Sequence, residues 1–417
     1  MRDNIMKLDQ ANLLKSSGIQ FFSLFLFIFI VASCDGILDV DAPTTIEEQE
    51  IDDPARADLL KEGTIADFEW AFDRYILMGG VLGNELADAT FTAAKWPLDQ
   101  RQITPETSPH SDYEAYEPLS TARWQADNAY EKFDEWEEEG HEFTNNKAIV
   151  SAYGAYSRIL LGEGFCRMAF DLGEELSQED VWQQAYDQFD AAISYAEQTG
   201  NDDIMNMSYV GKARALANMG NLAEAADYAA MVPEGFTFNM QAEDESRRRN
   251  AVYDQTIEFE NVTIGHLYRD FDLEGVTDPR VEVIDEERDS DGIPYFTTTK
   301  YDGRDAEIPI ARWEEAQLII AEYEGGQTAV DIINTLREPH DLPEFESNDD
   351  QEIMEQVIEE RQRELFLESH SLHDIAHYDE IDLNPAPGES HPRGGTYGDQ
   401  TCLPLPAEEV DNNPNID

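Results

Sequence analysis

Apolar residues recur with a helical period through most of this chain, and this pattern constrains its fold more than any other feature. Side chains three or four positions apart lie on one face of a helix, so an apolar stripe at that spacing predicts a helix packed against a core. The chain is therefore expected to be mostly α. The expected helices cover residues 53–86, 116–139, 144–170, 177–199, 203–219, 222–231, 308–324, 328–337 and 350–378.

Small residues within 213–233 resemble a tetratricopeptide helix pair, in which two antiparallel helices approach closely. A weaker copy covers 308–343, and segments 153–161 and 185–196 form a third candidate pair. We expect a tetratricopeptide-like helical-repeat scaffold with repeats at about 144–233 and 308–378. The alternative is a pair of alanine-rich helices that imitates this pattern. The residues that carry the first pair are Ala213, Leu216, Gly220, Leu222, Ala225, Ala229 and Pro233.

Two stretches break the helical period and are expected to form irregular loops and short strands. Residues 88–115 contain several prolines, and residues 234–307 contain β-branched and aromatic runs such as 295–299. Long loops on a rigid scaffold are where binding residues usually lie.

Aromatic rings in or just beside these two stretches are the candidate ligand-binding residues, because an aromatic ring can stack on the apolar face of a sugar. The alternative for each ring is packing within its own loop. The candidates are Trp96, Tyr113, Tyr116, Tyr295 and Tyr301. Tryptophans at helical spacing are instead expected in the core, namely Trp70, Trp124, Trp182 and Trp313.

The N-terminus has the layout of a lipoprotein signal peptide. Arg2, Lys7 and Lys15 precede an apolar segment at 21–32, and small residues lead into Cys34. The apolar segment is shorter than the roughly 20 residues that a spanning helix needs. We therefore expect residues 1–33 to be removed, Cys34 to carry the lipid anchor, and 34–417 to form one domain with a C-terminal tail at 379–417. The alternative is a chance cysteine near an ordinary signal peptide.

Acidic residues greatly outnumber basic residues along the whole chain. There are 90 Asp plus Glu against 28 Lys plus Arg, a formal net charge of −62. Self-repulsion of this size is relieved by salt, so the sequence predicts a high-salt habitat and a halophilic acidic surface. It argues against nucleic-acid binding, because phosphate recognition needs clustered basic residues.

Two further cysteines, Cys166 and Cys402, follow the candidate lipidation site. An exported chain can form a disulfide, which here would tie the C-terminal tail to a helix. The sequence does not show whether the two residues meet, so a bridge and two buried free thiols both remain open.

Several motifs together resemble the SusD/RagB family of outer-membrane nutrient-binding lipoproteins. The start of the mature chain, residues 37–40, reads ILDV, and the late helix and the C-terminal end follow the family pattern across essentially the whole mature chain. The departures are Ser369 for a usual glycine, Ser371 for a usual arginine and His377 at a common basic position, and the chain is short for the family. The matching residues are Lys300, Tyr301, Ile308, Pro309, Ile310, Glu360, Arg361, Glu364, Leu365, Glu368, Asp374, Ile375, Cys402, Leu403, Pro404, Leu405, Pro406, Glu409, Asn413, Pro414 and Asn415.

The resemblance implies a SusD-like fold and a lipid-anchored, surface-exposed protein of the outer membrane. It implies binding of oligosaccharide, or of peptide, and delivery to a SusC-like TonB-dependent transporter, with no catalysis and no cofactor. A lipid-anchored tetratricopeptide adaptor in envelope assembly and a surface glycosidase are the alternatives.

Metal and catalytic motifs are weak in this sequence. Residues 287–292 imitate the start of an EF-hand loop, but Thr298 stands where a bidentate Glu is required. His370 and His373 lack a third metal ligand in the sequence pattern. No metal site is expected, and no hydrolase, NTPase or dinucleotide motif is present.

Overall fold

The computed structural model describes residues 53–107, 113–244, 248–269, 271–273, 275–290 and 292–416. Cys34 and the ILDV segment at 37–40 lie outside these residues. Across the described part of the chain, no helix combines the length and the apolar character needed to cross a membrane.

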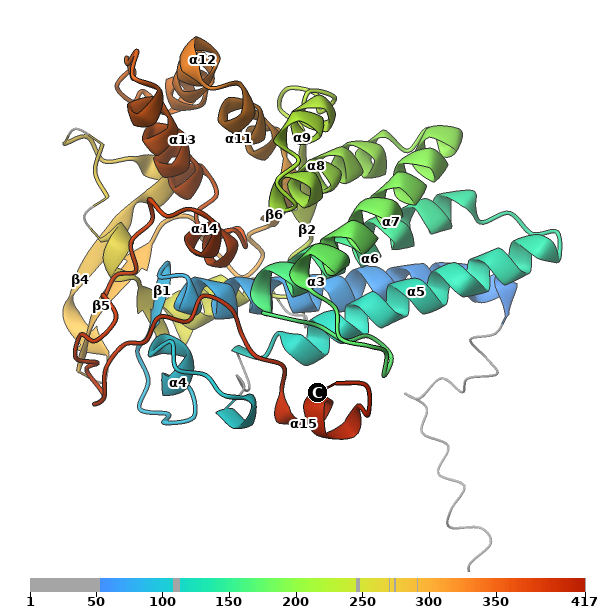
Figure 1. Cartoon of the computed structure of the whole chain (residues 1–417), viewed down its shortest axis with the longest axis horizontal. Helices are drawn as coiled ribbons and strands as arrows, with labels where there is room; N and C mark the ends of the chain where they lie inside the picture. The colour runs from blue at the N-terminus through green and yellow to red at the C-terminus, as the bar shows by residue number, and fades with distance from the viewer. Residues whose placement is uncertain are drawn as a thin grey trace, which may run out of the picture. The chain divides into compact units, whose positions relative to one another are not determined.

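The described chain is mostly helical, as the periodicity predicted, and successive helices pack side by side (Figure 1). Long helices make up the first half, and a second group of helices, α11 to α14, follows the strands. The α-helices are α3 (Ala57–Leu82), α4 (Trp96–Asp99), α5 (Tyr116–Glu138), α6 (Thr144–Gly164), α7 (Gln178–Thr199), α8 (Asp202–Asn218), α9 (Leu222–Ala229), α10 (Ala251–Tyr253), α11 (Trp313–Glu324), α12 (Gly326–Arg337), α13 (Asp350–Glu364), α14 (Ser371–His377) and α15 (Ala407–Asn412). Short 3-10 or π-helical turns lie at Pro54–Arg56, Pro105–Thr107, Asp254–Glu258, His266–Tyr268, Pro279–Val281 and Glu338–His340.

Local capping signals explain where several helices begin. Ser177 and Asp180 form a reciprocal capping box at the start of α7, and Gly200 ends that helix with a left-handed φ of 67°. Asn201 then caps α8, and Asp349 accepts hydrogen bonds from the first turn of α13.

The two non-helical stretches supply the strands. Each sheet among the described residues has two antiparallel strands: β1 (Leu86–Asp88) with β3 (Val262–Ile264), β2 (Thr237–Met240) with β6 (Ile308–Arg312), and β4 (Val283–Ser290) with β5 (Ile293–Thr298). Leu86 pairs with Ile264, Thr237 with Arg312, and Val283 with Thr298. The insertion at 234–307 thus pairs with segments on both sides of it.

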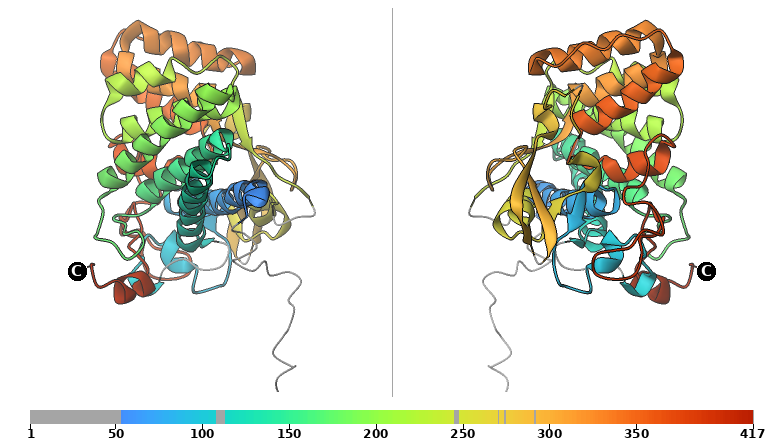
Figure 2. Two further views of the ribbon diagram at one scale, coloured as in Figure 1. Left: turned by 90° about the vertical axis from the view of Figure 1, so that its right-hand side faces the viewer. Right: turned by 90° about the vertical axis from the view of Figure 1, so that its left-hand side faces the viewer.

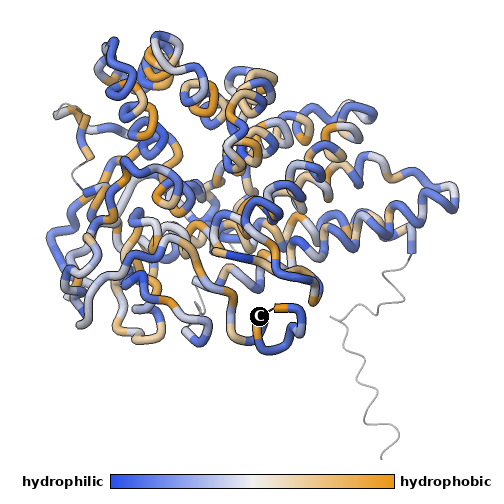
Figure 3. The backbone as a smooth tube through the Cα atoms, in the orientation of Figure 1, coloured by the Kyte–Doolittle hydropathy of each residue, from blue (hydrophilic) through white to orange (hydrophobic). Residues whose placement is uncertain are grey.

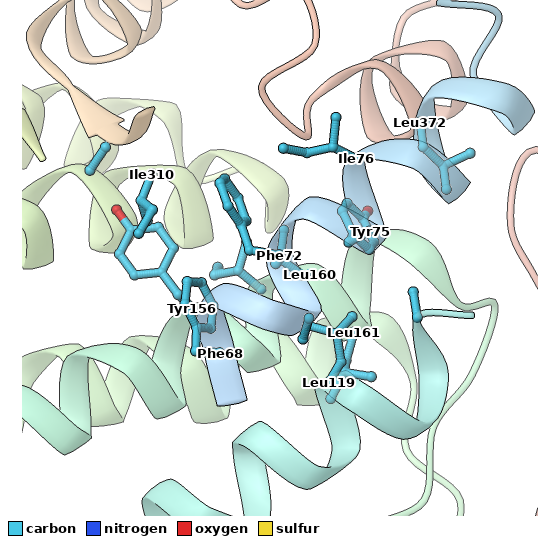
Figure 4. Close-up of a cluster of buried hydrophobic side chains, with 14 of the residues drawn as sticks. Phe68, Phe72, Tyr75, Ile76, Leu119, Tyr156, Leu160, Leu161, Ile310 and Leu372 are labelled. Atoms are coloured by element: carbon cyan, nitrogen blue, oxygen red, sulfur yellow. The ribbon is translucent and has the colours of Figure 1, made fainter. Parts of the chain in front are cut away.

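Apolar side chains of α3, α5, α6, α7 and α8 form the main core. Phe68, Phe72 and Tyr75 of α3 pack among residues of α6 such as Tyr156 and Leu160 (Figure 4). Polar and apolar residues alternate along these helices, as the hydropathy colouring shows (Figure 3). A second cluster joins α11, α12 and α13 around Ile333.

Three expected helices differ from the structure by five residues or more. Residues 308–312 of the helix expected over 308–324 form strand β6, so α11 begins at Trp313, and two other helices end early. The helix expected over 144–170 ends at Gly164, and the one expected over 350–378 is two helices, α13 and α14. Leu367 and Ser369 have φ values of 56° and 76°, which no α-helix accommodates. Ser369 thus adopts a backbone conformation that suits glycine, the residue usual at this position in the family that the sequence resembles.

The C-terminal tail runs back from α14 past α4 to α15 (Figures 1 and 2). Gly398 donates a backbone hydrogen bond of 2.7 Å to Gln100, and Leu403 forms a parallel bridge with Phe165. Cys166 and Cys402 form a disulfide with Cα atoms 5.2 Å apart, which is one of the two alternatives that the sequence left open.

Candidate functional site

A groove with a volume of about 730 Å³ lies between α5, the segment after α6 and the C-terminal tail. We call it the tail groove. Tyr116, Arg123 and Trp124 come from α5, and residues 169–172 form the floor beside them. Residues 406–409 and 412 of the C-terminal tail, which we call the tail wall, also line the groove, together with residues 105 and 106.

Two exposed apolar side chains line this groove. Trp124 is 49% exposed and Leu172 is 56% exposed, and both line the groove. Phe170 also lines the groove, and the guanidinium carbon of Arg123 lies 4.7 Å from the centre of its ring. A large ring that remains open to solvent beside ordered polar groups is the arrangement that a sugar-binding site requires.

Arg123 and Asp171 form a two-bond ion pair on the floor of the groove. Arg123 Nη1 donates to Asp171 Oδ2 at 2.6 Å, and Nη2 donates to Oδ1 at 2.9 Å. These hydrogen bonds lower the pKa of Asp171 below its ordinary value, so the carboxylate stays ionised. Both groups present fixed hydrogen-bonding atoms at the groove.

The backbone that carries Asp171 and Leu172 is strained. Both residues have positive φ, at 54° and 59°, although neither is glycine. Such conformations cost free energy and persist only where the surroundings impose them, often at binding sites. The turn directs Leu172 outward and holds Asp171 against Arg123.

A second depression of about 430 Å³ adjoins the tail groove and shares Arg123, Trp124 and Asp171 with it. Asp127 lies there and accepts hydrogen bonds from Arg158 Nη2 at 2.7 Å and Gln188 Nε2 at 3.3 Å. The two hollows therefore offer a continuous surface on either side of Trp124.

The tail wall is tied to α5 and to the floor. Tyr116 is hydrogen-bonded to Glu409, and its ring packs against Phe165 at 5.2 Å between centres. Burial, reinforced by Glu409, raises the pKa of Tyr116, so its hydroxyl stays protonated. Asn413 donates to Gly173 O at 3.0 Å, and the Asn415 side chain donates to Leu172 O at 2.7 Å.

The structure places one of the candidate aromatic residues, Tyr116, in the tail groove. Trp96 is half-buried in α4 and donates to Thr90 O at 3.3 Å.

The other three candidates, Tyr113, Tyr295 and Tyr301, are 1%, 1% and 6% exposed. The expectation that they lie open to a ligand is thereby corrected, because their rings fill the interior and their hydroxyls bond to protein atoms. Tyr113 donates to Asp88 Oδ1 at 2.9 Å and Tyr301 to Leu367 O at 3.0 Å, while Tyr295 donates to Thr256 O.

Trp124 was expected in the core, and this was wrong. The buried positions of α5 follow Leu119, Ala122, Ala126, Ala129, Phe133 and Trp136. Trp124 lies two residues from both Ala122 and Ala126, which is about 200° around a helix and therefore on the opposite face. The phase of the apolar stripe, rather than its period alone, therefore indicates that Trp124 faces away from the core. Of the other tryptophans assigned to the core, Trp182 is buried, while Trp70 and Trp313 are half-buried.

Within the described part of the chain, no three His, Cys, Asp or Glu residues are placed to hold a metal ion. His370 lies 3.3 Å from Arg214 Nη1 and 3.1 Å from Arg361 Nη2. Burial, with the positive charge of these arginines, lowers its pKa well below the ordinary value. His373 is also buried, with its pKa lowered to about 4 by burial.

Comparisons with known proteins find SusD proteins both by sequence and by structure. Residues 291–417 match the model of the SusD family. A SusD superfamily protein from Bacteroides vulgatus has a TM-score of 0.66 and 14% identity, covering 88% of this chain and 98% of its own. One from Parabacteroides distasonis has a TM-score of 0.63 and 14% identity, covering 86% and 98%. A laminarin-binding SusD-like protein has a TM-score of 0.66 and 14% identity, also covering 86% and 98%. A search of curated proteins finds no match.

These structural neighbours establish the fold, and the sequence match covers α11 to α15 together with β5 and β6. The matched segment includes the late helix and the C-terminal end whose residues carried the resemblance. Residues 291–417 thus match the SusD family by sequence, and the described chain shares the fold of SusD superfamily proteins.

Proposed function

We propose that this protein is a surface lipoprotein that binds oligosaccharide in the tail groove and delivers it to a SusC-like TonB-dependent transporter. The anchor is the lipid on Cys34, and the protein captures its ligand without catalysis. The fold shared with a laminarin-binding SusD-like protein supports a glycan ligand.

The observation that carries the proposal is the half-exposed ring of Trp124 beside the Arg123–Asp171 pair. Leaving such a ring in water has no benefit for folding, because an apolar side chain is stabilised by burial. A pyranose stacked on it would cover that surface, and its hydroxyls could bond to the carboxylate. Asp127 and Gln188 extend the polar contacts along the adjoining depression.

The test is isothermal titration of the purified chain with laminarihexaose, cellohexaose and maltohexaose. We expect at least one hexaose to bind, and Trp124→Ala to weaken that binding by about tenfold or more, equivalent to about 1.4 kcal/mol. The unfolding free energy should change little, because the side chain is already half in solvent.

Tyr323→Ala is the matched control, since Tyr323 is 47% exposed on α11 and lies outside the groove. Its affinity should equal that of the wild type. Equal loss in both variants, or binding that survives in Trp124→Ala, would contradict the assignment of the site. Release of reducing ends from a polysaccharide would favour the glycosidase alternative.

Delivery is tested by detergent extraction of the native membrane in high salt, followed by pull-down of the lipidated protein. We expect a stoichiometric barrel-sized partner with a plug domain, and loss of membrane association in Cys34→Ala. Recovery of assembly proteins in place of the barrel would favour the adaptor alternative.

A further inference from the structure

Carboxylates dominate the two hollows on either side of Trp124. Among the described residues that line them, eight contribute a carboxylate and one contributes a guanidinium. The acidic residues are Glu106, Glu114, Glu117, Asp127, Glu131, Asp171, Glu408 and Glu409, and the basic residue is Arg123.

The guanidinium groups nearest the groove are already neutralised. Arg123 holds Asp171 through two hydrogen bonds and lies 3.2 Å from Asp127. Arg158, which reaches the same Asp127 at 2.7 Å, also donates to Gln188 Oε1 at 2.8 Å. An anionic ligand would therefore have to displace a protein carboxylate to gain a charged hydrogen bond.

The carboxylates of the groove come both from α5 and from the C-terminal tail. Glu117 is exposed on α5, and Glu408 is exposed on α15. A hollow lined with charges of one sign concentrates their field, and a ligand charge placed a few ångströms from several of them is strongly attracted or repelled at low salt. Salt weakens this effect, because the screening length falls from about 10 Å at 0.1 M to about 3 Å at 1 M.

From these contacts we infer that the tail groove selects its glycan by charge: it accepts neutral and amine-bearing sugars and excludes sugars that carry carboxylate or sulfate. This inference rests on the proposed function, and it adds the chemical class of the ligand. Trp124 supplies a stacking surface that is indifferent to charge, and the carboxylates around it provide the discrimination.

The first test measures the electrostatic potential at the Trp124 ring in the absence of any sugar. Trp124 fluorescence, taken as the difference between the wild type and Trp124→Phe, is quenched with caesium and with iodide at about 0.1 M salt. Each quenching constant is divided by the constant for free N-acetyltryptophanamide with the same ion, because caesium is intrinsically the weaker quencher. We expect this normalised constant to be at least about threefold larger for caesium than for iodide, and the two to converge at about 1 M. Equal normalised constants at low salt would overturn the inference, whatever sugar the protein binds.

The second test varies only the charge of the ligand. The hexaose selected by titration is compared with its 6-carboxyl and 6-amino forms, which share its linkage and length. At about 0.1 M salt the carboxyl form should bind at least about tenfold more weakly than the neutral form, and the amino form at least as tightly. Equal binding of the carboxyl and neutral forms would overturn charge selection while leaving oligosaccharide capture intact. Failure of every neutral hexaose would instead count against the proposed function.

Two pairs of substitutions separate local from global charge. Glu117→Gln with Glu408→Gln removes two charges from the groove walls, whereas Glu344→Gln with Glu346→Gln removes two exposed charges before α13. The groove pair should reduce the ratio of the affinities for the neutral and carboxyl forms by about threefold or more. The control pair should leave this ratio unchanged. Equal effects of the two pairs would assign the exclusion to net charge and overturn the role of the groove.

Discussion

Cys166, two residues beyond the end of α6, is covalently joined to Cys402, five residues before α15 begins. The floor of the tail groove follows Cys166 in the chain, and the tail wall follows Cys402. One bond therefore joins the starting points of two segments that both line the groove.

Replacing both cysteines, Cys166→Ser with Cys402→Ser, should reduce the unfolding free energy by about 2–5 kcal/mol, because the bond closes a loop across 236 residues. It should also weaken ligand binding, because the tail wall loses its covalent anchor. Urea unfolding and titration with the selected hexaose measure the two effects. Reduction of the wild type with dithiothreitol is the control and should reproduce both. Unchanged affinity in a destabilised variant would show that the tail wall does not contribute to the site.

Gly211→Ala should destabilise the protein by about 1–3 kcal/mol through overpacking. A Cβ at Gly211 would meet the ring of Phe189 from α7 and would lie 2.8 Å from Cζ of Tyr156 in α6. Urea unfolding checks this. Gly63→Ala is the matched helical control: a Cβ at Gly63 meets nothing within 4 Å, so this variant should be stabilised by up to about 1 kcal/mol. Similar changes in the two variants would contradict close packing of α6, α7 and α8.

Glu85 should make the protein less stable as the pH rises from about 4.5 to about 7. Burial raises the pKa of Glu85 from 4.5 to about 7, despite a hydrogen bond from Leu367 N at 2.9 Å. Between these values the folded state keeps a proton that the unfolded state has lost, so stability falls with pH until both states are ionised.

Glu85→Gln removes this contribution. Between about pH 4.5 and about pH 7, the unfolding free energy of the variant should therefore rise relative to that of the wild type by on the order of 3 kcal/mol. Unfolding at several pH values measures the difference, which cancels the opposing contribution of His373, whose pKa is lowered to about 4. Glu344→Gln, at an exposed position, is the control and should show no shift. A difference that does not change with pH would contradict the buried position of the Glu85 carboxyl.

Salt should raise the melting temperature, because the formal net charge of −62 causes self-repulsion that is screened at high ionic strength. The increase should be largest between about 0.1 M and 1 M sodium chloride, where the screening length falls from about 10 Å to about 3 Å. Calorimetry at fixed pH measures it, with sucrose as an uncharged control. A melting temperature that is flat in salt would count against the proposed high-salt habitat.

The sequence predicted the helices well because their apolar stripes are buried against one another. The segment after α13 shows the limit of that approach. Apolar residues continue through 365–367, yet Leu367 and Ser369 take left-handed backbone conformations. Tyr301 donates a hydrogen bond to Leu367 O, and Arg214 Nη2 donates to Ser369 O at 3.2 Å. These contacts come from residues far away in the chain, so no local pattern could reveal them.

The candidate site was predicted less well, since Tyr116 was expected at a binding surface but Trp124 was placed in the core. Loop position was a poor guide, because Tyr113, Tyr295 and Tyr301 bury their rings where segments distant in sequence meet. The face of α5 that carries Trp124 stays open because the neighbouring helices cover the opposite face.

The sequence by itself determined the mostly helical fold class, the excess of acidic residues and the family motifs at the C-terminal end, because these depend on local periodicity and residue identity. Only the tertiary structure decided that Cys166 meets Cys402, that three candidate tyrosines are interior and that Trp124 faces a groove. Each of these depends on which surfaces of distant segments are brought together, and burial is a property of that assembly rather than of any one segment.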